Sequence, residues 1–276
     1  MFDTRNHLLL LIAASVIIAA AGYIINDYFD LNIDRVNKPE KLVVEKIIKR
    51  RWAIVLHIVL SVAGILFSIY IDFKEHTFWL GFSNFICVML LFGYSASLKK
   101  KFLAGNVLIS LLTAWVIFVV FLCYYFKGVY GQWGEHSIID GYLNRFIKLS
   151  FLYSGFAFII SLIREVIKDM EDMEGDEKYG CKTMPIVWGI PSTKVFTAVW
   201  LIVLIGALTI LQFYALHLHW WWSVVYSVIT IIVPLLWILQ KLYKAKVAKD
   251  YHQLSSAVKL VMLAGILSMI FFKIYS

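Results

Sequence analysis

The sequence predicts an all-α protein, a polytopic membrane bundle of helices. Hydrophobic residues make up 61% of its 276 residues and charged residues only 16%, whereas soluble domains carry about 25% charged residues. Several uncharged runs are long enough to cross the roughly 30 Å hydrocarbon core of a bilayer as a helix. No run alternates apolar and polar residues as the strands of a membrane barrel do. The chain is therefore expected to be an integral, multi-pass protein of the lipid bilayer.

Eight transmembrane helices are expected, joined by short loops. Their expected ranges are 7–29, 51–71, 77–98, 103–126, 146–168, 193–216, 219–241 and 254–275. Pro185, Gly189 and Pro191 are expected to form a loop before the sixth helix, because proline and glycine interrupt regular structure. Pro234 is expected to kink the seventh helix. Trp220 to Trp222 are expected to anchor that helix at the membrane surface.

Lysine and arginine are concentrated in one set of loops. The basic loops are 30–50, 99–102, 169–192 and 242–253. The loops that contain little Lys or Arg are 72–76, 127–145 and 217–218. The positive-inside rule places the basic loops in the cytoplasm. The chain is therefore expected to be a multi-pass protein of the cell (inner) membrane. This orientation also explains the net charge of +8, so neither a nucleic-acid nor a protein partner is predicted.

A cluster of carboxylates follows the first uncharged run. Asp27, Asp30 and Asp34 are spaced i, i+3 and i+7, which places them on one face of a helix. Three like charges on one face destabilise the helix unless a cation lies among them. With the neighbouring amide of Asn26 they offer the oxygen ligands that Mg²⁺ prefers. The alternative interpretation is a solvated helix end with scattered surface acids.

A second cluster repeats this spacing in the other half of the chain. Asp169, Asp172 and Asp176 each follow their counterpart by 142 residues. The matched spacing favours a functional site over scattered acids. It also predicts one domain over 1–276 with two pseudo-repeated halves, about 1–140 and 141–276.

Two Mg²⁺ ions held by these clusters would bind diphosphate oxygens and stabilise a diphosphate leaving group. Arg164 and Lys168 precede Asp172 by eight and four residues, so they lie on about the same helical stripe. Lys99 closes the third expected helix at the same membrane face. Tyr94 either donates a hydrogen bond to a phosphate oxygen or lies at the interface for purely amphipathic reasons.

These residues resemble a known family. Asn26-Asp27-x-x-Asp30-x-x-x-Asp34 resembles the first aspartate-rich motif of the UbiA superfamily of membrane prenyltransferases. The run from Arg164 to Asp176, followed by Lys182-Thr183-Met184-Pro185, resembles its second motif. Tyr94-Ser95-Ala96-Ser97-Leu98-Lys99 is similar to the Tyr…Lys element between the two.

The resemblance implies a fold, a reaction and a set of site residues. The fold is a bundle of nine helices around a cavity, so the family's first helix is expected to lie upstream of Met1. The reaction is the Mg²⁺-dependent transfer of a prenyl group from a prenyl diphosphate to a lipophilic acceptor. The implied ligands are Asn26, Asp27, Asp30 and Asp34 for one Mg²⁺ and Asp169, Asp172 and Asp176 for the other. The six aspartates among them are also the expected catalytic residues. The implied diphosphate-binding residues are Asn26, Tyr94, Lys99, Arg164 and Lys168.

The sequence around the first motif most resembles the geranylgeranylglycerol-phosphate geranylgeranyltransferase subgroup, which predicts geranylgeranyl transfer to a glycerol-phosphate lipid. Two alternatives remain. One is prenylation of an aromatic quinone precursor, 4-hydroxybenzoate or dihydroxynaphthoate. The other, from a different class, is a cation-coupled transporter, which also needs carboxylates and repeated halves.

Overall fold

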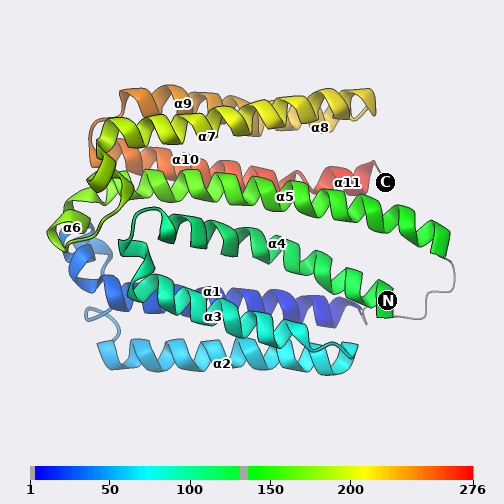
Figure 1. Ribbon diagram of the computed structural model, residues 1–276, viewed down its shortest axis with the longest axis horizontal. Helices are drawn as coiled ribbons and strands as arrows, with labels where there is room; N and C mark the ends of the chain where they lie inside the picture. Colours follow the sequence, from blue (N-terminus) through cyan, green and yellow to red (C-terminus); the bar gives the residue numbers. More distant parts are fainter. Residues whose placement is uncertain (1–3, 131–135, 276) are drawn as a thin grey trace. The chain divides into compact units, whose positions relative to one another are not determined.

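The computed structural model describes residues 4–130 and 136–275, and these are helical over most of their length (Figure 1). The long helices are α1 (Thr4–Asn37), α2 (Arg50–Glu75), α3 (Trp79–Ala96), α4 (Ala104–Tyr130), α5 (His136–Glu171), α7 (Met184–His217), α9 (Val233–Lys244) and α10 (Ala248–Leu267). The shorter ones are η1 (Pro39–Lys41), η2 (Leu98–Lys100), α6 (Met173–Lys178), α8 (Trp221–Ser227), η3 (Val228–Ile232) and α11 (Ile270–Ile274). Within the described residues eight helical segments are long and apolar enough to cross a membrane, which confirms the expected number.

Several expected boundaries are wrong. Helix α1 continues to Asn37, which confirms that the first acidic motif is helical, although the loop after it was expected to begin at residue 30. The loop expected over 127–145 is helical at both ends, because α4 continues to Tyr130 and α5 begins at His136. Residues 131–135 of that loop lie outside the described part.

The prediction of a loop before the sixth helix is also wrong. Helix α7 already begins at Met184 with Pro185 in its first turn, where a missing N–H costs nothing. It bends at Gly189, whose φ of 79° and ψ of 158° are not helical. Pro234 stands in the first turn of α9, directly after the π-helical turn η3. Where a kink at Pro234 was expected, the structure has a π-helical turn. The backbone hydrogen bonds of the helix are thus already rearranged before the proline.

The described helices divide into two compact units. One unit comprises Met1–Ser154 and Glu174–Cys181, and the other comprises Gly155–Met173 and Lys182–Ser276. The chain passes from one to the other within α5, returns to the first unit for α6, and then remains in the second. The pseudo-repeat of two halves stays a prediction.

In the first unit α1 and α2 pack closely along their length (Figure 1). The buried face of α2 carries small or polar residues at helical spacing, among them Ala53, Ser61, Gly64 and Ser68. A methyl group added at Gly64 would lie 2.6 Å from a side-chain carbon of Ile18, so only glycine permits this approach. Small residues at such a contact let two membrane helices come together, where apolar burial alone gives little driving force.

The turn between α2 and α3 is held by one buried carboxylate. Asp72 accepts hydrogen bonds from the backbone N–H of Leu80 at 3.3 Å and of Gly81 at 2.7 Å, and from the Thr77 hydroxyl at 2.5 Å. His76 closes α2 in a left-handed conformation, with φ 53°. The first N–H groups of α3 and the end of α2 are therefore satisfied within the turn.

In the second unit a cluster of buried apolar side chains joins the second half of α5 to α7, α9 and α10. Ile163, Leu201, Ile238 and Val258 each contribute to it, one from each helix. Trp220 stacks on Tyr275 with ring centroids 5.2 Å apart, while Trp221 and Trp222 are exposed as expected for an aromatic anchor.

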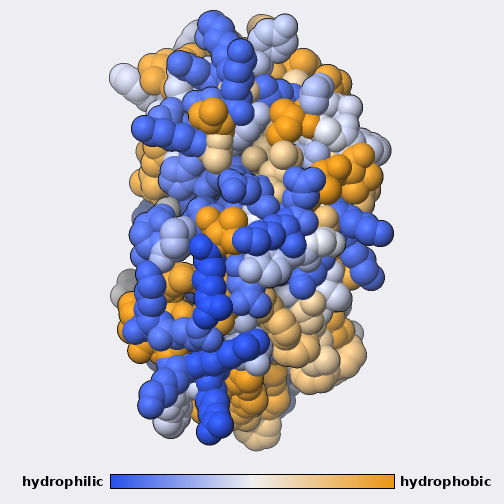
Figure 2. Space-filling model, turned by 90° about the vertical axis from the view of Figure 1, so that its left-hand side faces the viewer, coloured by the Kyte–Doolittle hydropathy of each residue, from blue (hydrophilic) through white to orange (hydrophobic). Residues whose placement is uncertain are grey.

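The surfaces of the helices fit a bilayer. Large apolar side chains are exposed along the sides of both units, for example Phe73 and Phe82 in the first and Ile210 and Phe213 in the second. Figure 2 looks at the helix ends drawn at the left of Figure 1, and hydrophilic side chains gather there. In the first unit this end includes the acidic motif of α1 and the connection from α3 to α4.

Candidate functional site

Three of the expected site residues meet at the end of α1 in the first unit. Asn26 donates its amide N–H to Asp30 Oδ2 at 2.7 Å. The Lys99 ammonium forms an ion pair with Asp30 Oδ1 and also donates to Asn26 Oδ1 at 3.3 Å. The Lys99 and Asp30 side chains are only 11% and 15% exposed, so water screens their charges weakly. The structure therefore joins the first acidic motif to the Tyr…Lys element.

Lys99 is positioned by the tight connection between α3 and α4. It lies in the 3₁₀ turn η2, and the next helix begins five residues later. A methyl group added at Gly105 would lie 2.6 Å from the Lys99 Cα and 3.1 Å from a ring carbon of Tyr94. Gly105 thus lets the start of α4 approach both Lys99 and the ring of Tyr94, which lies near the end of α3.

Aromatic rings line α1 between the acidic residues. The Arg50 guanidinium lies over the Tyr28 ring, 4.5 Å from its centroid. Phe29 contacts Phe92 edge to face, with centroids 5.7 Å apart. Asp27 and Asp34 are half-buried on the same helix. The motif therefore lies in a partly apolar setting, where its charges interact more strongly than on an open surface.

The last part of the second motif also belongs to the first unit. The backbone N–H of Gly175 in α6 donates to Asn37 Oδ1, at the end of α1, at 2.8 Å. A methyl group added at Gly175 would lie 2.6 Å from both Asn37 side-chain termini. This contact ties the segment that carries Asp176 to the helix that carries the first motif.

The earlier part of the second motif lies in the second unit, on the last turns of α5. Asp172 follows the helix end, and its N–H donates to the Lys168 carbonyl at 2.9 Å. Arg164 forms an ion pair with Glu165, whose side chain is 9% exposed. Arg164, Lys168 and Asp169 are half-buried. Arg164 and Lys168 therefore share α5 with Asp169, whereas Asp172, expected on the same helical stripe, lies just after the helix end.

A clamp from α10 holds the turn of the second motif. Glu171, between Asp169 and Asp172, contacts His252 Nδ1 through Oε1 at 2.8 Å. Its Oε2 accepts a hydrogen bond from the Ser255 hydroxyl at 3.1 Å. The Glu171 side chain is 7% exposed, so these two donors meet the needs of a nearly buried carboxylate.

In the His252→Ala/Ser255→Ala double variant we expect Glu171 and the turn beside it to shift. A buried carboxylate without hydrogen-bond donors costs about 1–3 kcal/mol, so the Glu171 side chain moves to find other partners. The expected result is an approximately tenfold higher Mg²⁺ concentration for half-maximal activity. The measurement is the initial rate against Mg²⁺ concentration, alongside the thermal unfolding midpoint. Ser256→Ala, on the same helix, is the matched control. An unchanged Mg²⁺ requirement in the double variant would show that the clamp does not position the motif.

The donor set fits a hard divalent cation. Asn26 and Asp30 supply amide and carboxylate oxygens, the ligands that Mg²⁺ prefers. Within the described residues no three His, Cys, Asp or Glu side chains are grouped as a complete cation site. Lys99 lies against the same oxygens, which shows that this position accepts positive charge.

Four supporting residues were not singled out from the sequence: Asn37, Gly105, His252 and Ser255. Asn37 and Gly175 are 138 residues apart, and His252 and Glu171 are 81 apart, so no local pattern links them. Gly175 and Glu171 did carry a signal, because both lie inside the second motif.

Comparisons with known proteins identify the family of the chain. Residues 1–266 match the UbiA prenyltransferase family. The digeranylgeranylglyceryl phosphate synthase of Methanosphaera stadtmanae is 29% identical over 96% of this chain and 88% of its own length. That of Sulfurisphaera tokodaii is 31% identical over 83% of this chain and 74% of its own.

Two solved structures share the fold. A UbiA homolog from Aeropyrum pernix K1 superposes with a TM-score of 0.69 at 14% identity, over 96% of this chain and 90% of that one. A structure from work on digeranylgeranylglyceryl phosphate synthase in membranes gives 0.60 at 24% identity, over 96% and 86%. The chain thus has the helical fold of these membrane proteins.

Proposed function

Because the chain belongs to the UbiA prenyltransferase family, we propose that it transfers a geranylgeranyl group from its diphosphate to a geranylgeranylglycerol phosphate-like lipid. The observation that carries this proposal is the joining of Asn26, Asp30 and Lys99 into one hydrogen-bonded group. It combines cation ligands with an ammonium group, which together suit a diphosphate. The names of relatives that align over most of the chain support the geranylgeranyl group and the lipid acceptor.

We propose Mg²⁺ as the cofactor. Asn26, Asp27, Asp30 and Asp34 would hold one ion, and Asp169, Asp172 and Asp176 of the second motif another. When bound, such ions neutralise the charge that develops on a diphosphate leaving group. This charge stabilisation is the main demand of the reaction, because cleavage of the allylic carbon–oxygen bond leaves a diphosphate anion and a carbocation.

Lys99 has a specific task in this proposal. In the structure its ammonium pairs with Asp30. Asp30 would hold the cation, and the Lys99 ammonium would bind a diphosphate oxygen beside it. Arg164 and Lys168 would bind the diphosphate from α5, and Tyr94 would support Lys99. The acceptor hydroxyl then attacks the allylic carbon, and its proton is released.

We propose a cytoplasmic orientation for the site in a multi-pass cell membrane. The motif end of α1 adjoins a segment rich in lysine and arginine, as does the connection that carries Lys99, and such segments remain on the cytoplasmic side. Water-soluble diphosphate product would leave on that side, while the prenyl chain and the acceptor's apolar tail remain in the bilayer.

The test is to incubate the purified chain in phosphatidylcholine vesicles with radiolabelled geranylgeranyl diphosphate and Mg²⁺. Geranylgeranylglyceryl phosphate, 4-hydroxybenzoate and dihydroxynaphthoate are offered separately, and products are identified by mass spectrometry. We expect labelling of the glycerol-phosphate lipid only. Labelling of an aromatic acceptor instead would overturn the proposed substrate, and absence of transfer to any acceptor would overturn the proposed activity.

A further inference from the structure

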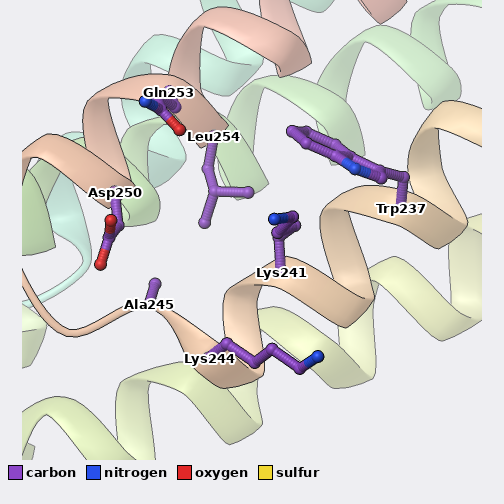
Figure 3. Close-up of a pocket in the computed structure, with 7 residues that line it drawn as sticks. All are labelled: Trp237, Lys241, Lys244, Ala245, Asp250, Gln253 and Leu254. Carbon is purple, nitrogen blue, oxygen red and sulfur yellow. The ribbon is translucent and has the colours of Figure 1, made fainter.

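A small polar cavity lies between the end of α9 and the start of α10 in the second unit. It measures about 130 Å³. Figure 3 shows its lining residues, Trp237, Lys241, Lys244, Ala245, Asp250, Gln253 and Leu254. This volume is far more than one water molecule needs but below the roughly 300–1,000 Å³ of sites that enclose a whole small molecule. The cavity therefore suits one compact group, such as a phosphate.

The backbone groups of the turn between α9 and α10 are satisfied by Lys194 and Asp250. Lys194 of α7 donates to the carbonyls of Ala245, at 2.5 Å, and Tyr243, at 3.4 Å, and so satisfies the end of α9. Asp250 accepts from the backbone N–H groups of Lys246, at 2.8 Å, and Val247, at 3.2 Å, and so caps the start of α10.

Two ammonium groups at the cavity then have no such structural task. In the described part of the chain, neither Lys241 nor Lys244 forms an ion pair. Lys241 rises from α9 toward Trp237 and Leu254 in Figure 3, and its ammonium lies 5.8 Å from the Trp237 ring centroid. Asp250 is turned toward Ala245, where the backbone N–H groups engage its carboxylate. With two ammonium groups and one carboxylate, the lining of the cavity carries a net positive charge.

The position of the cavity selects the kind of anion. The apolar segments Trp221–Lys244 and Ala248–Ile274 flank it, so it lies where two membrane spans emerge from the bilayer. Trp237, one turn before Lys241, is 43% exposed and is suited to the level of lipid headgroups. Long lysine stems lie along apolar surface while their ammonium groups reach the interface.

We propose that this cavity binds the phosphate of an anionic phospholipid of the surrounding bilayer, with Lys241 and Lys244 as its cationic partners and Gln253 as a hydrogen-bond donor. The acyl chains lie along the exposed side of α9 beside Trp237. Basic recesses between membrane helices at the interface bind lipid headgroups through this combination of charge and apolar contact. None of the residues that line the cavity is among those proposed for the transfer reaction.

The experiment measures lipid binding by native mass spectrometry of the full chain in detergent. Phosphatidylglycerol or phosphatidylcholine is titrated into the wild type, the Lys241→Gln/Lys244→Gln variant and the Lys246→Gln/Lys249→Gln variant. The last is the matched control, because it loses the same charge from the same segment but from residues that do not line the cavity. Thermal unfolding midpoints check that both variants fold.

The wild type and the control are expected to prefer phosphatidylglycerol. The cavity variant is expected to bind it about 30-fold more weakly, since each lysine near a membrane surface contributes about 1 kcal/mol to the attraction of anionic lipid. Equal losses in both variants would overturn the proposal in favour of diffuse attraction to a basic segment. No preference for phosphatidylglycerol in the wild type would also overturn it.

Two further arms identify the source of the phosphate. Millimolar inorganic phosphate is expected to leave phosphatidylglycerol bound, and displacement would show that the cavity holds a free anion instead. In phosphatidylcholine vesicles the cavity variant is expected to keep the wild-type KM for geranylgeranylglyceryl phosphate. A raised KM with unchanged phosphatidylglycerol binding would reassign the cavity to the acceptor and overturn the bilayer lipid as its ligand.

Discussion

Replacing Asp30 with alanine is expected to lower Mg²⁺-dependent release of diphosphate by about 10³-fold or more. Asp30 accepts from both Asn26 and Lys99, so its removal takes away a proposed Mg²⁺ ligand and the one carboxylate of this hydrogen-bonded group. Stabilisation by a bound cation contributes several kcal/mol, and each 1.36 kcal/mol corresponds to tenfold in rate. The measurement is diphosphate release from geranylgeranyl diphosphate over a range of Mg²⁺ concentrations.

Two further variants make this result interpretable. Asp30→Ala leaves the Lys99 ammonium nearly buried and without its carboxylate, which can destabilise the fold. Asp30→Asn keeps an oxygen acceptor and the side-chain shape while it removes the charge, and the same large loss is expected. Glu40→Ala removes an exposed carboxylate just beyond α1 and should keep full activity. Full turnover by Asp30→Asn would refute a role for this carboxylate in the reaction.

Replacing Gly175 with alanine is the second change with a large expected effect. The added methyl group would lie 2.6 Å from the Asn37 amide, so α6 must move or Asn37 must turn away and give up its hydrogen bond. Asp176 is the next residue and would move with α6. A misplacement of about 1 Å near reacting groups can cost about 10²-fold, and we expect a loss of about that size in the rate of prenyl transfer.

A double variant tests the steric cause. Asn37→Ala alone removes one hydrogen bond, at a cost of about 1 kcal/mol. If the clash is the cause, Asn37→Ala/Gly175→Ala should be more active than Gly175→Ala alone, a non-additivity typical of residues in contact. Gly206→Ala, at a helical glycine with open space around it, is the control and should leave the rate unchanged. Additive losses in the double variant would show that Gly175 acts in some other way.

The sequence predicted the helices well because apolar runs and loop charges are local signals. All eight expected spans correspond to membrane-length helices within the described residues. Their ends were less predictable. The carboxylate spacing correctly predicted a helix through the first motif, but the basic loop was expected to begin at residue 30, whereas α1 remains helical to Asn37, where α6 docks. At Gly189 the expected break is a bend within one helical segment, because the helix resumes directly after the non-helical residue.

The site was predictable in its chemistry but not in its support. The spacing of Asp27, Asp30 and Asp34 indicated a shared face, and the place of Lys99 at the end of the third expected helix put it at the same membrane face. The pairing of Lys99 with Asp30 spans 69 residues, and it depends on the close approach that Gly105 permits. Such long-range contacts are set by packing between helices, for which a single sequence holds no periodic signal. The roles of the second motif's aspartates stay predictions.

The hydrogen bonds that Asp72 accepts between α2 and α3 have a consequence for biogenesis. A polar group that enters lipid without a partner costs several kcal/mol, so a helix pair is easiest to insert when its connecting turn needs nothing from the rest of the chain. Asp72 supplies the acceptors for Thr77, Leu80 and Gly81 from within the pair itself. We therefore expect α2 and α3 to enter the bilayer from the translocon together, as one folded hairpin, before most of the protein has been synthesised.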